Sequence, residues 1–201
     1  MRSLIIRPIQ AGFTLVELLI VVIIIAILAA IVVPQFTSAT LDAQEAALDA
    51  NLAAMRSAIE LFHAQHATLS STSSISSAYP GVTATNGGSC TATKGSATTA
   101  NTDQAFKDHL LMASDKDGNT CSISDSTTFK FGPYLRKGIP PDPINQNATV
   151  ATPLQTTGAP LVADATAGGW KYDSKSGQII MNSSAKDSKW TATSPTLYSS
   201  H

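Results

Sequence analysis

The chain has 201 residues, of which 13% are charged, and its formal net charge at pH 7 is -1. This length accommodates one ordinary domain plus an appended element, and the near-neutral charge argues against nucleic-acid binding through a broad basic surface. Large aliphatic side chains are concentrated in the first third, whereas the rest is rich in Ser, Thr, Ala, Gly and Asn. This asymmetry fits a membrane segment attached to a polar, exported head.

The N-terminal segment is predicted to enter a membrane. Residues 1–12 carry arginine and no acidic residue, so the positive-inside rule keeps them on the cytoplasmic side. Residues 13–33 are apolar except for Thr14 and Glu17, and as a helix they would span roughly 30 Å, the thickness of a bilayer core. A carboxylate in such a helix costs at most about 3 kcal/mol, which the many Leu, Ile and Val residues offset at about 0.3–0.6 kcal/mol each.

Two simpler explanations of this segment leave Glu17 without a role. A secretory signal peptide would have a shorter apolar core followed by small residues at a cleavage site. The sequence ILAA at residues 27–30 could serve as that site, but residues 31–33 continue the apolar run past it. A plain membrane anchor gives no reason for a carboxylate inside the segment.

The sequence AGFTLVELLIVVIIIAILAAIVVP, which ends at Pro34, resembles the N-terminal segment of type IV prepilins and of type II secretion pseudopilins. The resemblance rests on Gly12, on Phe13 directly after it, on Glu17 four residues further on, and on the uninterrupted aliphatic run. It implies that a prepilin peptidase cuts between Gly12 and Phe13, removes the leader and methylates the new amino group of Phe13. Glycine, which lacks a Cβ, lets the backbone approach a protease closely.

The resemblance also implies a role for Glu17 in assembly. After the cut, the Phe13 amine is a cation one helical turn from Glu17. In a filament of packed helices, Glu17 of one subunit can meet the amine of a neighbour in an apolar core. An unpaired buried charge is costly, so this pair would select one axial register, while packing of Leu, Ile and Val would contribute most of the assembly energy.

Residues 34–69 are predicted to continue the helix as an amphipathic half that packs under the head. The expected helix runs from Phe13 to Leu69 and is loosened near Pro34, because proline removes a backbone donor. Large apolar side chains recur along it at helical spacing, at Leu41, Leu48, Leu52, Met55, Ile59 and Phe62.

Two patterns resemble metal sites only in part. His63 and His66 form an HxxH pair, but no acidic or cysteine partner stands at ligand spacing, so they are predicted to be ordinary polar helix residues. The segment SDKDGNTCSISD lacks the glycine at the sixth position and the glutamate at the twelfth that a calcium loop requires. An Asp-Gly turn is predicted instead, and no metal ligand is assigned to Asp115, Asp117, Asn119 or Asp125.

Cys90 and Cys121 are too few and too far apart for a zinc framework. In an exported protein they are predicted to form one disulfide, which would stabilise the fold by roughly 3–4 kcal/mol in the chain-entropy model. The alternative is a pair of buried or idle thiols. Cys90 lies in a Ser/Thr/Gly-rich segment that is predicted to be a long surface loop, tied down by this bond.

The head, residues 70–201, is predicted to be a small α+β unit with an antiparallel sheet of about three or four strands. Its expected elements are a short helix at 102–112, a strand at 127–131, an extended segment at 140–143, a hairpin of 170–172 with 178–182, and a loosely ordered tail at 189–201.

The motifs GPYL and GGWKYDSKSG resemble the sheet region of pseudopilin G-type proteins and related pilins. Two familiar features are not recognisable. The acidic, glycine-rich calcium loop of the major pseudopilin has no counterpart, and no cysteine follows Cys121 to form the C-terminal disulfide loop of many type IV pilins.

The sequence contains no Walker A, GxSxG, HExxH or dinucleotide motif, so neither an enzyme nor a bound cofactor is predicted. The whole pattern predicts a pilin-like fold and favours a pseudopilin of a type II secretion filament over the alternative, a type IV pilin of a surface fibre. A membrane-anchored periplasmic binding domain that never polymerises is a third hypothesis. Expected partners are prepilin peptidase, other copies, minor pilins or pseudopilins, an inner-membrane platform and a separate ATPase. The expected location is the inner membrane, then a periplasmic or surface filament.

Overall fold

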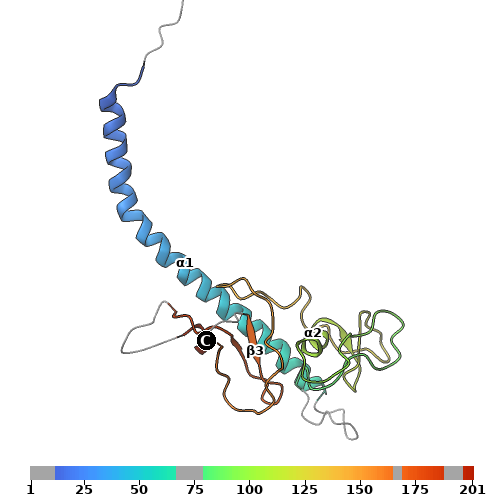
Figure 1. The fold of residues 1–201 in the computed structure, drawn as a ribbon. Coiled ribbons are helices and arrows are strands. Elements are labelled where there is room, and N and C mark those ends of the chain that lie inside the picture. The colour runs from blue at the N-terminus through green and yellow to red at the C-terminus, as the bar shows by residue number, and fades with distance from the viewer. Residues whose placement is uncertain (1–11, 67–78, 165–168, 188–196) are drawn as a thin grey trace, which may run out of the picture. The chain divides into compact units, whose positions relative to one another are not determined.

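The computed structural model describes residues 12–66, 79–164, 169–187 and 197–201 (Figure 1). Contacts divide the chain into two compact units, one ending at Leu41 and one running from Asp42 to His201. The elements are α1 (Leu15–His66), α2 (Asp103–Leu111), β1 (Ala113–Ser114), β2 (Thr120–Cys121), β3 (Trp170–Tyr172), β4 (Ile179–Met181) and the 3-10 helix η1 (Tyr198–Ser200). A long N-terminal helix followed by a short helix and small antiparallel sheets is the pilin-like α+β fold predicted from the sequence.

Helix α1 has 52 residues, and its helical backbone continues without a break through Pro34. It begins at Leu15, two residues after the predicted start at Phe13, because the side chains of Thr14 and Glu17 cap the helix at that point. Its described part ends at His66, so the last predicted helical residues, 67–69, lie outside the described residues.

The second half of α1 provides one side of the core of the head (Figure 1). Its apolar stripe packs against α2, β3 and β4, as the periodicity predicted. Leu41 is the exception, because its side chain is 37% exposed and lies in the other unit. The main core consists of fully or nearly fully buried side chains from these elements, including Leu48, Leu52, Met55, Ile59, Phe106, Leu110, Trp170, Tyr172, Ile179 and Met181.

Helix α2 confirms the short helix predicted at residues 102–112. The Thr102 side chain caps its first turn by accepting a hydrogen bond from the Ala105 amide. Phe106 and Leu110 lie one turn apart and are both fully buried, which fixes the helix against the core. The polar residues between them, Asp108 and His109, are also buried.

The predicted hairpin is confirmed by the antiparallel pair β3 and β4, in which Trp170 faces Met181 and Tyr172 faces Ile179. The Asp173 carboxylate accepts a hydrogen bond from the Lys175 amide in the connecting turn. Gly177 closes that turn with a φ of +73°, and a Cβ there would collide with the Tyr79 ring. The turn therefore requires glycine.

The prediction of a single sheet of three or four strands is wrong. Among the described residues there are two sheets of two strands each, β1 with β2 and β3 with β4, extended by isolated bridges. Only Phe131 of the predicted strand 127–131 pairs, through a bridge to Ser114. The Asp125 carboxylate accepts hydrogen bonds from the amides of residues 127–129, so these amides turn back on the chain instead of joining a ladder.

The tail prediction is wrong for residues 197–201, and residues 188–196 lie outside the described residues. Leu197 pairs with Lys186, and η1 follows it. The His201 imidazole lies 2.9 Å from an Asp49 carboxylate oxygen, and Arg56 donates to the His201 backbone oxygen at 3.0 Å. These contacts hold the segment against α1.

A disulfide joins Cys90 to Cys121, with their Cα atoms 5.5 Å apart. It attaches the loop that precedes α2 to strand β2. The same loop also bonds through its backbone to β2 and to the residue after it, from the Gly95 amide to the Thr120 carbonyl and from the Ser122 amide to the Thr93 carbonyl. The loop is thus attached to the head by a covalent bond and by its backbone.

Candidate processing and assembly site

The chain just before α1 is exposed and has no regular secondary structure. Gly12, Phe13 and Thr14 precede the first helical residue, and the Phe13 side chain is 85% exposed. A Cβ added at Gly12 would meet no described atom within 4 Å. The described part of the chain therefore does not itself require glycine at this position, and a requirement for glycine would come from a partner such as a protease.

Thr14 and Glu17 form a capping box at the start of α1. The Glu17 amide donates to Thr14 Oγ1 at 3.2 Å, while the Thr14 amide and hydroxyl donate to Glu17 Oε2 at 2.9 and 2.8 Å. This reciprocal arrangement satisfies backbone donors that a helix N-terminus otherwise leaves unpaired. It also explains why the helix begins at Leu15. The motif TLVE at residues 14–17 is the usual signature of a capping box, so the sequence carried a signal for this role of Glu17.

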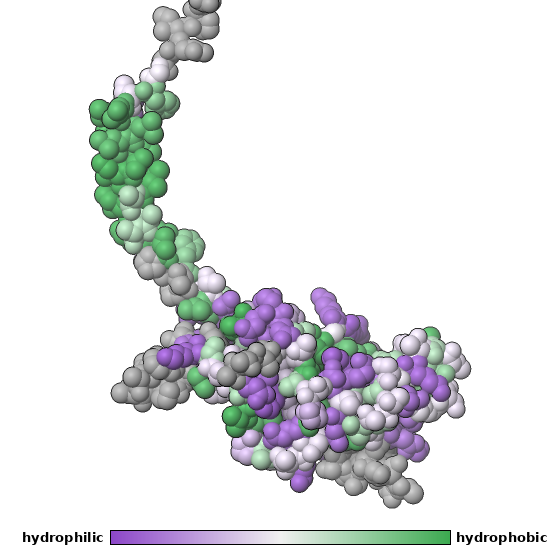
Figure 2. Space-filling view, viewed as in Figure 1, coloured by the Kyte–Doolittle hydropathy of each residue, from purple (hydrophilic) through white to green (hydrophobic). Residues whose placement is uncertain are grey.

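The helix that follows the cap presents apolar side chains on all sides. Residues 15–33 form a segment of 19 residues that is long and apolar enough to cross a membrane, and none of it is buried within the chain. Figure 2 shows a nearly continuous hydrophobic surface along this helix. A helix that is apolar all round needs lipid or other protein around it, so this surface is suited to a membrane or to the interior of an assembly.

Glu17 is the only charged side chain in residues 13–33. In the full-length chain the Phe13 nitrogen is a peptide amide, so a cation at this position arises only if the bond after Gly12 is cut. Both Thr14 hydrogen bonds reach Oε2 of the Glu17 carboxylate. Within the described residues, Oε1 is thus available to a second donor.

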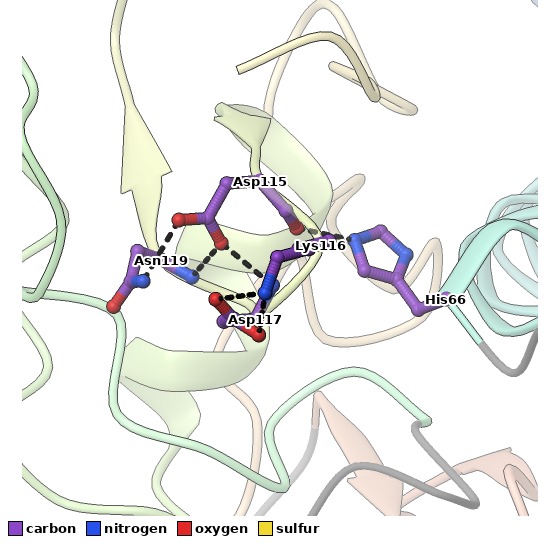
Figure 3. A network of polar contacts seen from close by, with 5 residues as sticks. All are labelled: His66, Asp115, Lys116, Asp117 and Asn119. Carbon is purple, nitrogen blue, oxygen red and sulfur yellow. Dashed lines mark hydrogen bonds and ion pairs between the residues drawn. The ribbon is translucent and has the colours of Figure 1, made fainter. Parts of the chain in front are cut away.

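The calcium-like segment of the head forms the predicted Asp-Gly turn (Figure 3). Asp115 Oδ1 accepts hydrogen bonds from the amides of Asp117 and Asn119, and Oδ2 accepts one from the Asn119 side chain. Gly118 adopts a φ of +84° and donates to the Asp115 carbonyl. The Asp115 oxygens therefore shape the turn, and the described residues contain no group of three or more His, Cys, Asp or Glu arranged to hold a metal.

The prediction that His66 is an ordinary polar helix residue is wrong, because its side chain is fully buried. Its Nδ1 lies 2.9 Å from the Phe62 carbonyl oxygen. Its Nε2 lies 3.1 Å from the Asp115 carbonyl oxygen (Figure 3). Burial lowers the pKa of His66, although these two carbonyls act in the opposite direction. His63 is half-buried and stacks on the Tyr79 ring.

Comparison with known proteins finds similarity over parts of the chain. Residues 7–33 match the family described as the prokaryotic N-terminal methylation motif. A segment of 47 residues is 57% identical to the type IV narrow pilus major component PilA5 of Thermus thermophilus. That alignment covers 23% of this chain and 40% of the relative. No solved structure matches the chain.

The family match covers the exposed residues just before α1, the cap and the exposed apolar helix. The chain thus carries the prokaryotic N-terminal methylation motif and is similar, over part of its length, to a type IV pilus component.

Proposed function

We propose that the chain is the subunit of a type IV pilus-like surface fibre, processed between Gly12 and Phe13 and methylated on the Phe13 amine. The observation that carries this proposal is the fully unburied apolar helix, residues 15–33, which lies within the match to the methylation motif at residues 7–33. The similarity to a type IV pilus component favours the fibre over the secretion filament, which the sequence alone had favoured.

Assembly exchanges one apolar environment for another. Before assembly, the apolar helix lies in the inner membrane with the leader on the cytoplasmic side. In the fibre, the same side chains pack against the helices of neighbouring subunits, so extraction from lipid costs little hydrophobic free energy. This chain carries no nucleotide-binding motif, so a separate ATPase and an inner-membrane platform supply the work.

Glu17 has two successive roles in this proposal. In the precursor its carboxylate completes the capping box with Thr14. After the cut, the methylated Phe13 amine of a neighbouring subunit binds the same carboxylate, and the pair fixes the axial register. Its net contribution to stability is small, because burying both charges costs about as much as their attraction returns.

A secretion pseudopilin is the second candidate, because the hairpin of β3 and β4 carries the GGWKYDSKSG motif. The two candidates differ in where the assembled subunit is found. A fibre subunit is recovered from the medium after mechanical shearing of intact cells, whereas a pseudopilin stays in the periplasm at native expression levels. Recovery from the periplasm alone would overturn the fibre proposal in favour of the pseudopilin.

Mass spectrometry of the sheared material tests the processing step. The expected N-terminal residue is Phe13 with one added methyl group. An intact Met1, or a new N-terminus near Ala30, would contradict processing by prepilin peptidase. The second result would support ordinary signal-peptide cleavage instead.

Two variants separate the capping role of Glu17 from its assembly role. Thr14→Val removes the hydroxyl partner and should weaken the start of α1 by about 1 kcal/mol while fibres still form. Glu17→Leu removes the cap and the charge together, and it should insert into the membrane but abolish fibres of normal register. The measurement is the yield and helical order of sheared fibres by electron microscopy. Equal defects in the two variants would show that Glu17 acts only as a cap.

A further inference from the structure

Helix α2 holds the loop that precedes it through a buried carboxylate. Asp108 Oδ2 accepts hydrogen bonds from Thr85 Oγ1 at 2.6 Å, from the Ser96 amide at 2.7 Å and from the Ala97 amide at 3.1 Å. Gln104 donates to the other carboxylate oxygen at 2.7 Å. One side chain thus organises two separate stretches of the loop.

The next residue of α2, His109, holds the start of the same loop. Its Nδ1 accepts a hydrogen bond from the Gly81 amide at 2.8 Å, so Nδ1 carries no proton in this arrangement. Its Nε2 lies 2.9 Å from the Gly118 carbonyl oxygen and donates to it. The fold therefore selects the neutral ring with the proton on Nε2. A second proton, on Nδ1, would face the Gly81 N–H and break that bond.

The surroundings of His109 also oppose a positive charge on its ring. The side chain is fully buried, and burial is the main cause that lowers its pKa to about 4. His66 acts in the same direction from α1, while Asp108 and the Gly118 carbonyl partly oppose the shift. Asp115, in the turn between β1 and β2, acts on His66 rather than on His109.

The two buried histidines differ in what a proton would do to them. Both rings contact the Phe62 ring, with centroid distances of 4.0 Å for His66 and 4.9 Å for His109. His66 faces a carbonyl oxygen with each nitrogen, so a protonated His66 has two acceptors in place. His109 faces one carbonyl and one N–H, so a protonated His109 loses a bond.

We propose that His109 is an acid-sensitive clasp, in which proton uptake breaks its bond to Gly81 and releases the start of the loop from α2. The bonds to Asp108 and the Cys90–Cys121 disulfide keep the rest of the loop in place. The opening is therefore local and reverses when the pH rises. Its consequence is a head surface that differs between neutral and acidic surroundings while the core of α1, β3 and β4 stays folded.

The size of the effect follows from proton linkage. The open loop exposes His109 to solvent, where its pKa returns to about 6.5. Between pH 7 and pH 4, the equilibrium constant for opening should rise about 100-fold, because the open form binds the proton more tightly than the closed form.

Amide hydrogen exchange on the full-length chain in detergent measures this opening. After correction for the intrinsic effect of pH on exchange, protection of the Gly81 amide should fall about 100-fold from pH 7 to pH 4. The Trp170 amide, which donates to the Thr149 carbonyl, serves as an internal reference and should change much less. Equal protection of Gly81 at both pH values would overturn the proposal.

His109→Gln identifies the responsible group. The glutamine amide can accept from Gly81 and donate to Gly118, but it does not titrate, so protection of Gly81 should become nearly independent of pH. His63→Gln is the matched control on α1 and should retain the dependence. The same loss of protection in His109→Gln would assign the opening to another group and refute the clasp. If that variant does not fold, an NMR titration of His109 in the unmodified chain decides, and a ring that titrates near pH 6.5 in the folded protein contradicts the clasp.

Discussion

The two halves of α1 are both helical and both carry large apolar side chains, but only the second half buries them within the chain. Ile24 in the first half is 52% exposed, whereas Ile59 in the second half is completely buried. Helical structure and apolar content are therefore not enough to locate a binding partner. For residues 42–66 the partner is the head of the same chain, whereas residues 15–41 need one from outside it.

This difference also separates two kinds of free energy. Burial of the second half contributes to folding of the single chain, at roughly 25 cal/mol per Å² of apolar surface removed from water. Burial of the first half contributes only to membrane insertion or to assembly. Substitutions in the two halves should accordingly affect different measurements.

The largest expected effect comes from a substitution at the proposed processing site. Cleavage there would permit assembly, in which the first half of α1 packs against other subunits. Gly12→Val should leave only unprocessed precursor in the membrane and eliminate fibres, because a branched side chain next to the cut obstructs the peptidase. Electrophoresis and mass spectrometry of membranes measure the result. Ala30→Val is the control and should be processed normally, since residue 30 matters only to a signal peptidase. Normal processing of Gly12→Val would contradict the proposed cut.

A matched pair of core and surface substitutions tests the comparison directly. Ile59→Ala should destabilise the head by about 2–5 kcal/mol, because it leaves a cavity in the main core. Ile24→Ala should leave the stability of the head unchanged, although it removes the same atoms. Denaturant unfolding of the full-length chain in detergent, followed by near-ultraviolet circular dichroism, measures both. Similar losses in the two variants would show that the first half also supports the fold of the head.

The disulfide should contribute a similar or smaller amount to the head alone. Replacing Cys90 and Cys121 with serine should lower the free energy of unfolding by roughly 3–4 kcal/mol in the chain-entropy model and leave membrane insertion intact. In the unmodified protein, thiol alkylation without reductant should label neither residue. Labelling of both would exclude the bond.

The regular elements could be predicted from the sequence because each carried its own local signal. The stripe from Leu48 to Phe62 has the helical period, Thr102 supplies the cap of α2, and the turn after Tyr172 contains the glycine that its geometry needs. The strand predicted at residues 127–131 failed because alternation is a weaker signal than a nearby carboxylate. Asp125 binds the amides that a ladder would have used.

The candidate site was predictable to a different extent. The processing and assembly roles of Gly12, Phe13 and Glu17 come from the local motif and stay predictions, whereas the capping role of Glu17 was missed although TLVE is visible in the sequence. The burial of His66 and His109 could not be predicted, because their partners are carbonyls and amides of distant loops. The Asp115 carbonyl lies 49 residues from His66 in the chain, and no sequence period marks such a contact.

The position of the Thr14–Glu17 cap has a consequence for maturation. The helix is already closed off by its own side chains one residue beyond the proposed scissile bond, so cleavage would remove no helical turn and demand no refolding. The mature helix would then leave the enzyme already folded and capped, with its new amino group one peptide unit before the capping residue Thr14.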